Sequence, residues 1–192
     1  IIVDYSGIAV AAAFSQKQPD QLDQGVVRHM ILNSLRMHNI KNRGEFGQMV
    51  VACDSSSWRK EIFPEYKAAR KKSRETSKLD WNKFFTMANN VRDEIKENFS
   101  YPVVTVDRAE ADDIIGILVL ELQEFGRHEE ILIVSGDKDF LQLQQFSNVK
   151  QYSPVQRKFL ECEDPHRYLF EHICKGDSSD GVPNVLSPDN TF

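Results

Sequence analysis

The stretch ILIVSGDKDF at residues 131–140 carries the plainest structural signal in the sequence. Its first four residues, Ile131 to Val134, are all aliphatic and predict a short strand that is buried on both faces. A glycine turn follows immediately and carries two carboxylates, Asp137 and Asp139. In open parallel sheets, ligands bind beyond the carboxyl ends of the strands. We therefore expect these acids to lie at a functional edge of a sheet.

The same pattern, a short apolar strand followed by a longer helical segment, recurs along the chain. Further strands are predicted at residues 1–4, 48–53, 102–106 and 149–152. Apolar residues at i, i+3 and i+4 predict helices at 22–40, 79–99 and 109–125, the last stopping near Gly126, with a short helix at 140–145. This alternation predicts an α/β fold whose central, mostly parallel sheet has helices on both faces. The length of 192 residues suits one such domain.

The composition excludes several classes of protein. Hydrophobic residues make up 41% of the chain and charged residues 28%, which is typical of a globular domain and not of a disordered one. The three cysteines, Cys53, Cys162 and Cys174, form no C-x-x-C pair, so neither a disulfide framework nor a structural zinc site is predicted. The apolar runs at 7–14 and 114–120 are too short to span a bilayer. We expect a soluble cytoplasmic protein without membrane contact.

Charge is distributed unevenly along the chain. The net charge is −5, from 24 basic and 29 acidic residues. The segment 59–78 holds eight basic and three acidic residues and so carries +5, which leaves −10 for the rest. A charge run is usually a solvated surface. Beside an acidic site, however, it would neutralise phosphates and steer a polyanion toward that site, and Tyr66 within it would be placed to stack on a base. The sequence leaves open whether this segment is helical or flexible.

Carboxylates follow each of the strands predicted at 1–4, 48–53, 102–106 and 131–134. They are Asp4, Asp54, Glu110, Asp112, Asp113, Asp137 and Asp139. Seven carboxylates crowded into one crevice would repel one another and raise one another's pKa, so such a site is stable only when divalent cations occupy it. An all-oxygen set of ligands favours Mg²⁺ or Mn²⁺ over Zn²⁺.

Each acidic group also has an ordinary explanation. Acids at the start of a helix commonly cap it, which would account for Glu110-Ala-Asp-Asp113. Asp54 and Asp107 fit turn positions. Asp4 is harder to explain in this way, because an acid that closes a buried strand must be paired or solvated. Acids at four strand ends together favour the metal site, with Asp107 left as a turn residue.

The segment Lys175-Gly-Asp-Ser-Ser-Asp-Gly-Val-Pro183 supports two interpretations equally well. It fits an ordinary turn rich in glycine and proline between helices. It also fits a loop whose backbone N–H groups hold a phosphodiester while Asp177 and Asp180 face the metal site. The spacing alone does not choose between them.

Taken in order, these motifs resemble the structure-specific 5′ nucleases, a family of flap endonucleases, polymerase 5′-exonuclease domains and phage 5′-exonucleases. The resemblance rests on Asp4, Asp54, Trp58-Arg-Lys, Tyr66-Lys-Ala-Ala-Arg70, Glu110-Ala-Asp-Asp113, Ser135-Gly-Asp-Lys-Asp139 and Gly176-Asp-Ser-Ser-Asp180-Gly-Val-Pro. The order and spacing hold over nearly the whole chain, and they are most similar to the phage ribonucleases H. The resemblance implies a PIN-like 5′-nuclease fold with a basic arch or lid at 59–78.

The resemblance also implies two Mg²⁺ ions, which Mn²⁺ can replace, and a role for each acid. The first ion would be held by Asp4, Asp54, Asp112 and Asp137, with Glu110 touching it directly or through water and Asp113 as a further candidate ligand. The second would be held, partly through water, by Asp139, Asp177 and Asp180. The catalytic group would consist of Lys67 and Arg70, which contact the scissile phosphate, with Asp112 and Asp137.

The resemblance further implies how DNA is held. The nucleic-acid-binding residues would be Arg59, Lys60, Tyr66, Lys67, Arg70, Lys71, Lys72, Arg74, Gly176 and Gly181. A catalytic α/β domain would span 1–174, and 175–192 would begin a helix–three-turn–helix element that binds the duplex backbone. The family continues into a C-terminal helical region that is absent here. Since the sequence begins inside a strand and ends in the loop-like PNVLSPDNTF, we expect it to be the core of a longer protein.

The reaction implied is a two-metal hydrolysis of phosphodiesters at 5′ ends or flaps of duplex DNA and of RNA–DNA. The activity would be that of a 5′→3′ exonuclease, flap endonuclease and ribonuclease H, which removes RNA primers in phage DNA replication. The protein would be phage-encoded and act in the infected bacterial cell. Candidate partners beyond the nucleic acid are a single-strand-binding protein and a sliding clamp.

Three alternatives predict different residues. A PIN-type endoribonuclease would usually lack both the basic arch and the loop at 176–181. A haloacid-dehalogenase-like phosphatase would carry Asp-x-Asp at the first strand, where this chain has Asp4-Tyr-Ser6. A non-catalytic DNA-junction binder on the same fold would have lost metal-site acids, and the sequence retains the full set.

Overall fold

A six-stranded sheet forms the centre of the molecule. The computed structural model describes residues 1–16, 22–124 and 129–188, so the predicted helix stop near Gly126 and the last four residues of the 175–192 segment lie outside it. The strands are β1 (Ile2–Asp4), β2 (Val50–Cys53), β3 (Val103–Thr105), β4 (Ile131–Val134), β5 (Val149–Ser153) and β6 (Lys158–Leu160). Their spatial order is β3-β2-β1-β4-β5-β6.

The sheet is mostly parallel, which confirms the predicted fold class. The strands β3, β2, β1, β4 and β5 pair in parallel, and only β6 pairs antiparallel, with β5. Strand β6 was not predicted. Its three residues Lys-Phe-Leu are partly exposed, so they lack the buried apolar pattern by which a strand is recognised.

Most of the predicted helices are present. The helices of the described residues are α1 (Tyr5–Phe14), α2 (Gln24–Phe46), α3 (Arg59–Ile62), α4 (Ala68–Glu75), α5 (Trp81–Asn98), α6 (Ala111–Glu124), the 3₁₀ helix η1 (Lys138–Gln145) and α7 (Pro165–Lys175). Helix α2 continues to Phe46, past its predicted end at residue 40. Helices α1 and α7 were not predicted. Helix α1 lacks a polar face to reveal its period, because it is rich in small apolar residues packed against neighbouring helices.

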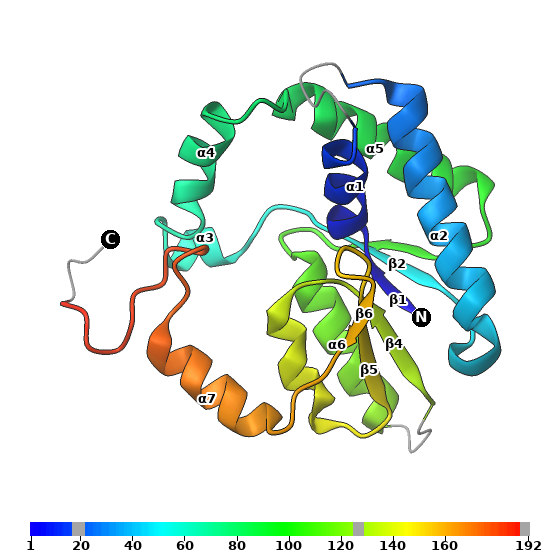
Figure 1. Ribbon diagram of the computed structural model, residues 1–192. Helices are drawn as coiled ribbons and strands as arrows, with labels where there is room; N and C mark the ends of the chain where they lie inside the picture. The colour runs from blue at the N-terminus through cyan, green and yellow to red at the C-terminus, as the bar shows by residue number, and fades with distance from the viewer. Residues whose placement is uncertain (17–21, 125–128, 189–192) are drawn as a thin grey trace.

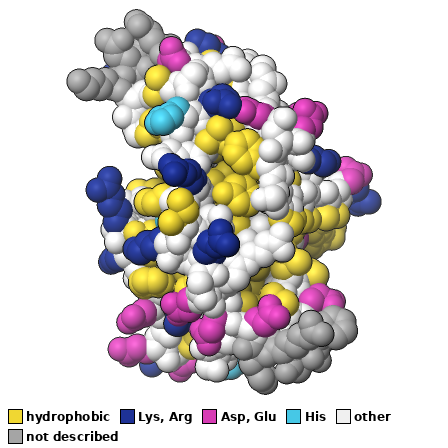
Figure 2. All heavy atoms as spheres, turned by 90° about the vertical axis from the view of Figure 1, so that its right-hand side faces the viewer, with side chains coloured by type: hydrophobic (Ala, Val, Ile, Leu, Met, Phe, Trp, Pro, Cys, Tyr) yellow, Lys and Arg dark blue, Asp and Glu magenta, His cyan; other side chains and the backbone are white. Residues whose placement is uncertain are grey.

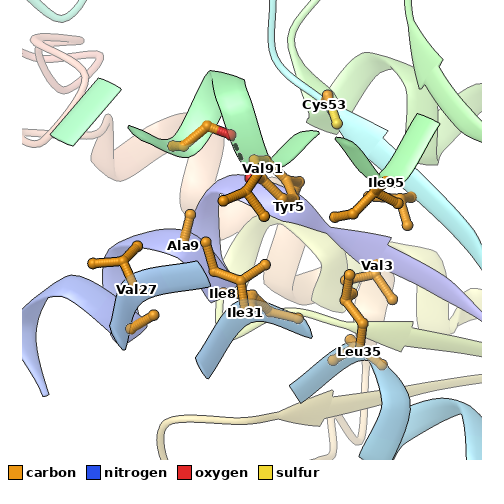
Figure 3. Close-up of a cluster of buried hydrophobic side chains, with 14 of the residues drawn as sticks. Val3, Tyr5, Ile8, Ala9, Val27, Ile31, Leu35, Cys53, Val91 and Ile95 are labelled. Atoms are coloured by element: carbon orange, nitrogen blue, oxygen red, sulfur yellow. Dashed lines mark hydrogen bonds between the residues drawn. The ribbon is translucent and has the colours of Figure 1, made fainter. Parts of the chain in front are cut away.

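Helices cover both faces of the sheet, and alternate strand residues face each side. Val3, Val51 and Val134 pack on the side of α1, α2 and α5, whereas Ile2 and Ile133 pack on the side of α6 and η1. Figure 3 shows the first of these clusters, where the Tyr5 hydroxyl donates to the Ala88 carbonyl at 2.5 Å. This packing fixes the directions of β1, β2 and β4, and so the positions of the residues at their carboxyl ends.

The basic segment is helical and stands away from the sheet. Figure 1 shows α3 and α4 on the opposite side of the molecule from α2, in a chain that leaves β2 and returns to α5. Figure 2 shows the α2 side, where acidic, basic and hydrophobic side chains all lie at the surface. None of the helices in the described ranges is long and apolar enough to cross a membrane.

Candidate active site

Four carboxylates lie at the carboxyl edge of the sheet, and we call them the inner acids: Asp4, Asp54, Asp112 and Asp137. Asp4 ends β1, Asp54 follows β2, and Asp137 follows β4 and caps η1. Asp112 lies in the first turn of α6. Strand ends distant in sequence do bring these acids together, because the charges of Asp54 and Asp137 lie close enough to act on both Asp4 and Asp112.

Hydrogen bonds from neighbouring backbone and serine groups orient the inner acids. The Asp4 carboxylate accepts the Gly7 N–H at 3.0 Å and the Ser135 hydroxyl at 2.9 Å. A side chain at position 7 would place its Cβ 2.8 Å from Asp4 Oδ2, so this close approach requires glycine. Asp54 accepts the Ala111 N–H at 2.8 Å, which ties the end of β2 to the start of α6. These contacts hold the carboxylates in place without neutralising them.

The surroundings of Asp4 and Asp112 disfavour the charged forms of both carboxyl groups. Burial, followed by repulsion from Asp137 and Asp4, raises the pKa of Asp112 from 3.8 to about 7. Burial also raises the pKa of Asp4, and Asp54 and Asp137 add to this effect. Among the described residues, no Lys, Arg or His lies within 4.0 Å of a carboxylate oxygen of the inner acids. Together these residues form an oxygen-rich site with uncompensated negative charge.

Three other acids, which we call the bridged acids, are paired with cations of the basic segment: Glu110, Asp113 and Asp180. Lys67 Nζ lies 2.7 Å from Glu110 Oε1 and 3.7 Å from Asp180 Oδ2. Arg70 Nη2 lies 2.5 Å from Asp180 Oδ1. Arg59 donates to both carboxylate oxygens of Asp113, at 2.7 and 2.9 Å. The arch is therefore joined by ion pairs to α6 and to the loop that follows α7.

The pKa values of Glu110 and Asp113 move in the opposite direction from those of Asp4 and Asp112. Burial raises the pKa of Glu110, but hydrogen bonds from Lys67 and Tyr66 outweigh it, and the net pKa is lowered. Burial also acts to raise the pKa of Asp113, but the Arg59 guanidinium outweighs it, and this pKa is lowered as well. In this structure, Glu110 and Asp113 are thus engaged with the arch. Their predicted contact with the first metal stays a prediction.

Tyr66 does not fit the stacking role predicted for it. Its side chain is 7% exposed, and its hydroxyl donates to Glu110 Oε2 at 2.8 Å. The Lys67 ammonium lies 4.7 Å from the centre of the ring. The aromatic ring is therefore almost fully buried, which leaves little of its face for a base to stack on. Its observed contacts position Glu110 and Lys67.

Lys67 itself has an unusual backbone conformation. Its φ of 58° places it in the left-handed region, which a residue with a side chain seldom adopts. Its N–H donates to the Asp180 carbonyl at 2.9 Å, and its ammonium donates to Glu110 Oε1 at 2.7 Å. The left-handed turn thus places Lys67 between α6 and the loop at 176–182. Such strain, held by the surrounding contacts, is common at functional sites.

The other predicted nucleic-acid-binding cations are exposed along the arch: Lys60, Lys71, Lys72 and Arg74. Arg74 lies over the rings of Trp81 and Phe85, with its guanidinium carbon 5.1 Å from each ring centre. This contact joins α4 to the start of α5. The role of these cations in binding DNA stays a prediction.

The loop after α7 is a tight turn closed by backbone pairing. Asp177 and Val182 exchange two backbone hydrogen bonds of 2.8 Å. Gly176, with φ of 69°, would place a Cβ 2.4 Å from the carbonyl oxygens of Val182 and Pro183, so only glycine fits there. The Gly176 N–H already donates to the His172 carbonyl at 3.0 Å. This N–H is therefore engaged within the fold in this structure, and the roles of Gly176 and Gly181 in binding nucleic acid stay predictions.

Two carboxylates and one histidine form an outer group beside the inner acids: Asp139, His172 and Asp177. One ligand atom from each lies within 4.8 Å of the others. Burial, then repulsion from Asp137, raises the pKa of Asp139. The sequence pattern gave no sign of His172, because α7 was not predicted and a single histidine five residues before Asp177 has no recognised ligand spacing. Asp139 and Asp177 do come together, as predicted, and Asp180 adjoins Asp177, whose carboxylate accepts the Asp180 N–H at 3.3 Å.

A cavity of about 710 Å³ lies over these groups. Its lining includes the carboxylates of Asp112, Asp139 and Asp177 and apolar side chains from α3, α6 and α7, among them Ile62 and Ile173. The cavity therefore offers both charged and non-polar surface. This arrangement suits a ligand with a phosphate and a less polar body.

The comparison with known proteins agrees with this geometry. Residues 1–168 match the protein family described as "5'-3' exonuclease, N-terminal resolvase-like domain". The chain belongs to this family. The ribonuclease H of Enterobacteria phage T4 is 35% identical to this exonuclease domain over 96% of the chain. The flap endonuclease Xni of Shewanella pealeana is 30% identical over 69% of the chain.

Solved structures show the same fold. The phage T5 5′-exonuclease with bound divalent metal ions (zinc) is 20% identical, with a TM-score of 0.72 over 97% of this chain and 70% of that one. A complex of the T5 D15 flap endonuclease with DNA and metal ions is 19% identical, with a TM-score of 0.70 over the same share of this chain. The chain spans 62% of the length of the T4 ribonuclease H and 50% of the Xni protein.

The residues of the inner acids fit divalent ions. Their donors are all carboxylate oxygens, and their charge lacks a cation within ion-pair distance among the described residues. The pKa of Asp112 is raised to about 7, first by burial and then by repulsion from Asp137 and Asp4. A hard divalent cation would remove that cost.

Proposed function

We propose that this exonuclease domain hydrolyses phosphodiesters at the 5′ ends or flaps of duplex DNA, and of RNA paired to DNA, with divalent metal ions. The observation that carries the proposal is the separation of the acids into two sets. The inner acids lack cationic partners among the described residues, whereas the bridged acids are neutralised by the arch. Four carboxylates without cationic partners are suited to bind metal ions. The Lys and Arg side chains of the arch beside them are suited to bind phosphate.

The inner acids would hold one Mg²⁺ or Mn²⁺ ion, and Asp139, Asp177 and Asp180 a second. When bound, such ions supply an activated water and stabilise the charge of an in-line displacement at phosphorus. The protein contributes the fixed positions of the carboxylates: Asp4 through Gly7 and Ser135, and Asp54 through Ala111. Because these contacts come from strand ends and a helix start, the ligands need little rearrangement on binding.

The cations of the arch would bind the scissile phosphate. Lys67 and Arg70 now contact carboxylates, and a phosphate entering the cavity would offer them an alternative anion with the same hydrogen-bonding geometry. Release from Glu110 and Asp180 would turn both side chains toward the substrate. Lys60, Lys71 and Lys72 extend this positive surface along the arch, so binding should weaken steeply with salt and depend little on base sequence.

The substrate preference within this class follows from the relatives. The similarity to the phage T4 ribonuclease H supports RNA-primer removal during phage DNA replication as the biological role. Duplexes with 5′ ends or flaps are the proposed partners, and a single-strand-binding protein and a sliding clamp are further candidates. The segment 175–192 would begin the duplex-binding element.

The test is cleavage of a 5′-labelled flap duplex that carries an RNA segment, with Mg²⁺, with Mn²⁺ and with EDTA. The proposal expects short 5′ products only when metal is present, from the RNA strand as well as from DNA. An intact flap, bound by the protein but uncut in both metals, would contradict the proposed activity and favour a junction-binding protein. Cleavage that persists in EDTA would contradict the metal dependence.

A further inference from the structure

The outer group contains a nitrogen donor that the carboxylate ligands predicted from the sequence do not include. His172 Nε2 lies 3.3 Å from Asp139 Oδ1 and 4.0 Å from Asp177 Oδ2. Ligand atoms about 2.1 Å from one metal ion lie roughly 3 Å apart at neighbouring octahedral positions and roughly 4 Å apart at opposite ones. The three side chains therefore have the spacing of a metal site before any ion binds.

The loop after α7 leaves one oxygen of the Asp177 carboxylate available to bind a metal ion. Asp177 Oδ1 accepts the Ser179 N–H at 2.7 Å and the Asp180 N–H at 3.3 Å, whereas its other oxygen, Oδ2, faces His172. The loop therefore fixes the Asp177 carboxylate by one oxygen and presents the second. Asp139 is held at the start of η1, where its N–H donates to Asp137 Oδ1 at 3.0 Å.

Helix α7 orients the imidazole. Tyr168, one turn earlier on the helix, stacks on His172 with ring centres 5.8 Å apart and an angle of 9° between the planes. The His172 side chain is 33% exposed, so a metal ion can reach it from the cavity. The stacked ring holds the plane of the imidazole, and Nε2 lies on the side of the two carboxylates.

We propose that His172 is a nitrogen ligand of the metal ion bound by Asp139 and Asp177, and that it makes this position favour Mn²⁺ over Mg²⁺. The proposal rests on the proposed function, which places a second ion here. Imidazole suits transition metals, whereas Mg²⁺ prefers oxygen ligands and retains its water. The inner acids, which supply oxygen alone, carry no such preference. The two positions would thus differ in the metal they select.

The test is pulsed EPR of Mn²⁺ bound to the full chain, in which a directly bound nitrogen modulates the electron spin echo. The measurement is made in the Asp112→Asn variant. This substitution weakens Mn²⁺ binding at the inner acids, so the signal comes from Mn²⁺ bound at the outer group. The expected result is nitrogen modulation that changes frequency with ¹⁵N labelling and disappears when His172→Gln is added. His166→Gln, an exposed histidine of the same helix, should leave the modulation unchanged.

A calorimetric titration completes the test. His172→Gln should weaken Mn²⁺ binding at one position by roughly tenfold or more and Mg²⁺ binding by much less. His172→Asp, an oxygen donor, should restore binding of Mg²⁺ but not the nitrogen signal. Mn²⁺ that binds without nitrogen modulation, or modulation that survives His172→Gln, would overturn the inference. If the wild type still cleaves flaps with metal in that case, only the role of His172 fails and the proposed function stands.

Discussion

The inner acids and the bridged acids lie side by side, yet they differ in whether Lys or Arg side chains contact them. Glu110, Asp113 and Asp180 each contact a Lys or Arg from the arch, and the pKa values of Glu110 and Asp113 are lowered. The inner acids have no such partner among the described residues, and the pKa values of Asp4 and Asp112 are raised. The arch therefore pairs with the bridged acids and, in the described part of the chain, leaves the carboxylates at the strand ends without a cation at ion-pair distance.

The difference follows from where each set is attached. The inner acids are fixed to strand ends and the first turn of α6, and their hydrogen bonds come from short side chains and backbone groups that carry no charge. The bridged acids face the arch, whose long cationic side chains reach them. Removing an inner acid should thus relieve repulsion and abolish activity, whereas removing a bridged acid should leave a cation without its partner and destabilise the fold.

The largest expected effect is the loss of cleavage when an inner acid is removed. Asp112→Asn should lower the rate of flap cleavage by roughly 1,000-fold or more, because it removes a metal ligand. Single-turnover cleavage of a labelled flap duplex measures it, with gel-shift binding as the check that DNA is still held. Asp107→Asn, in the exposed turn after β3, is the matched control and should cleave at the wild-type rate.

A bridged acid should behave differently. Glu110→Gln should lower the free energy of unfolding by roughly 3 kcal/mol, because Lys67, with a side chain 13% exposed, would lose the carboxylate 2.7 Å away. A fall in melting temperature of about 6 to 12 °C follows for a chain of this size. Thermal unfolding without metal measures this. A variant as stable as the wild type would show that the ion pair does not hold the arch.

Asp112 also makes the stability of the metal-free protein depend on pH. Asp112 has a pKa of about 7 in the folded state, above its ordinary 3.8, so the folded protein binds more protons than the unfolded chain between these values. The contribution of Asp112 to the free energy of unfolding is therefore favourable below about pH 4 and is lost as the pH rises through 7. Asp112→Asn should flatten this slope and be more stable than the wild type by roughly 2 kcal/mol at pH 8 in EDTA. Urea unfolding across this range measures the slope, and equal slopes would contradict the assignment.

The smallest effect is expected at the edge of the arch. Arg59→Lys keeps the charge beside Asp113 but loses the two-point contact with its carboxylate. The free energy of unfolding should fall by about 1 kcal/mol, since both side chains are partly exposed. Denaturant unfolding checks this, with Arg108→Lys, an exposed pair with Glu61, as the control that should change little.

The sequence predicted the sheet and the inner acids because both depend on local pattern. Ile131 to Val134 is a run of buried aliphatic residues, and the strand found there has the same bounds. Acids at the ends of parallel strands must meet at one edge, so the positions of Asp4, Asp54 and Asp137 in the sequence are enough to bring them together. The clustering of acids thus follows from topology alone.

The partners within the site could not be predicted in this way. That Glu110 pairs with Lys67 and Asp113 with Arg59 depends on how the arch folds back over α6, which the sequence left open. The burial of Tyr66 has the same origin. His172 belongs to α7, whose place beside η1 is set by tertiary packing. Long-range side-chain contacts of this kind have no signature in residue spacing.

The central claim is that the inner acids are an uncompensated metal site, and the most direct measurement is the melting temperature of the wild type and of Asp112→Asn at pH 8, in EDTA and in saturating Mg²⁺. We predict that Asp112→Asn is the more stable protein in EDTA, and that Mg²⁺ raises the melting temperature of the wild type by about 5 °C or more and that of the variant far less. A wild type that is unaffected by Mg²⁺, or a variant that gains as much from it, would contradict the account.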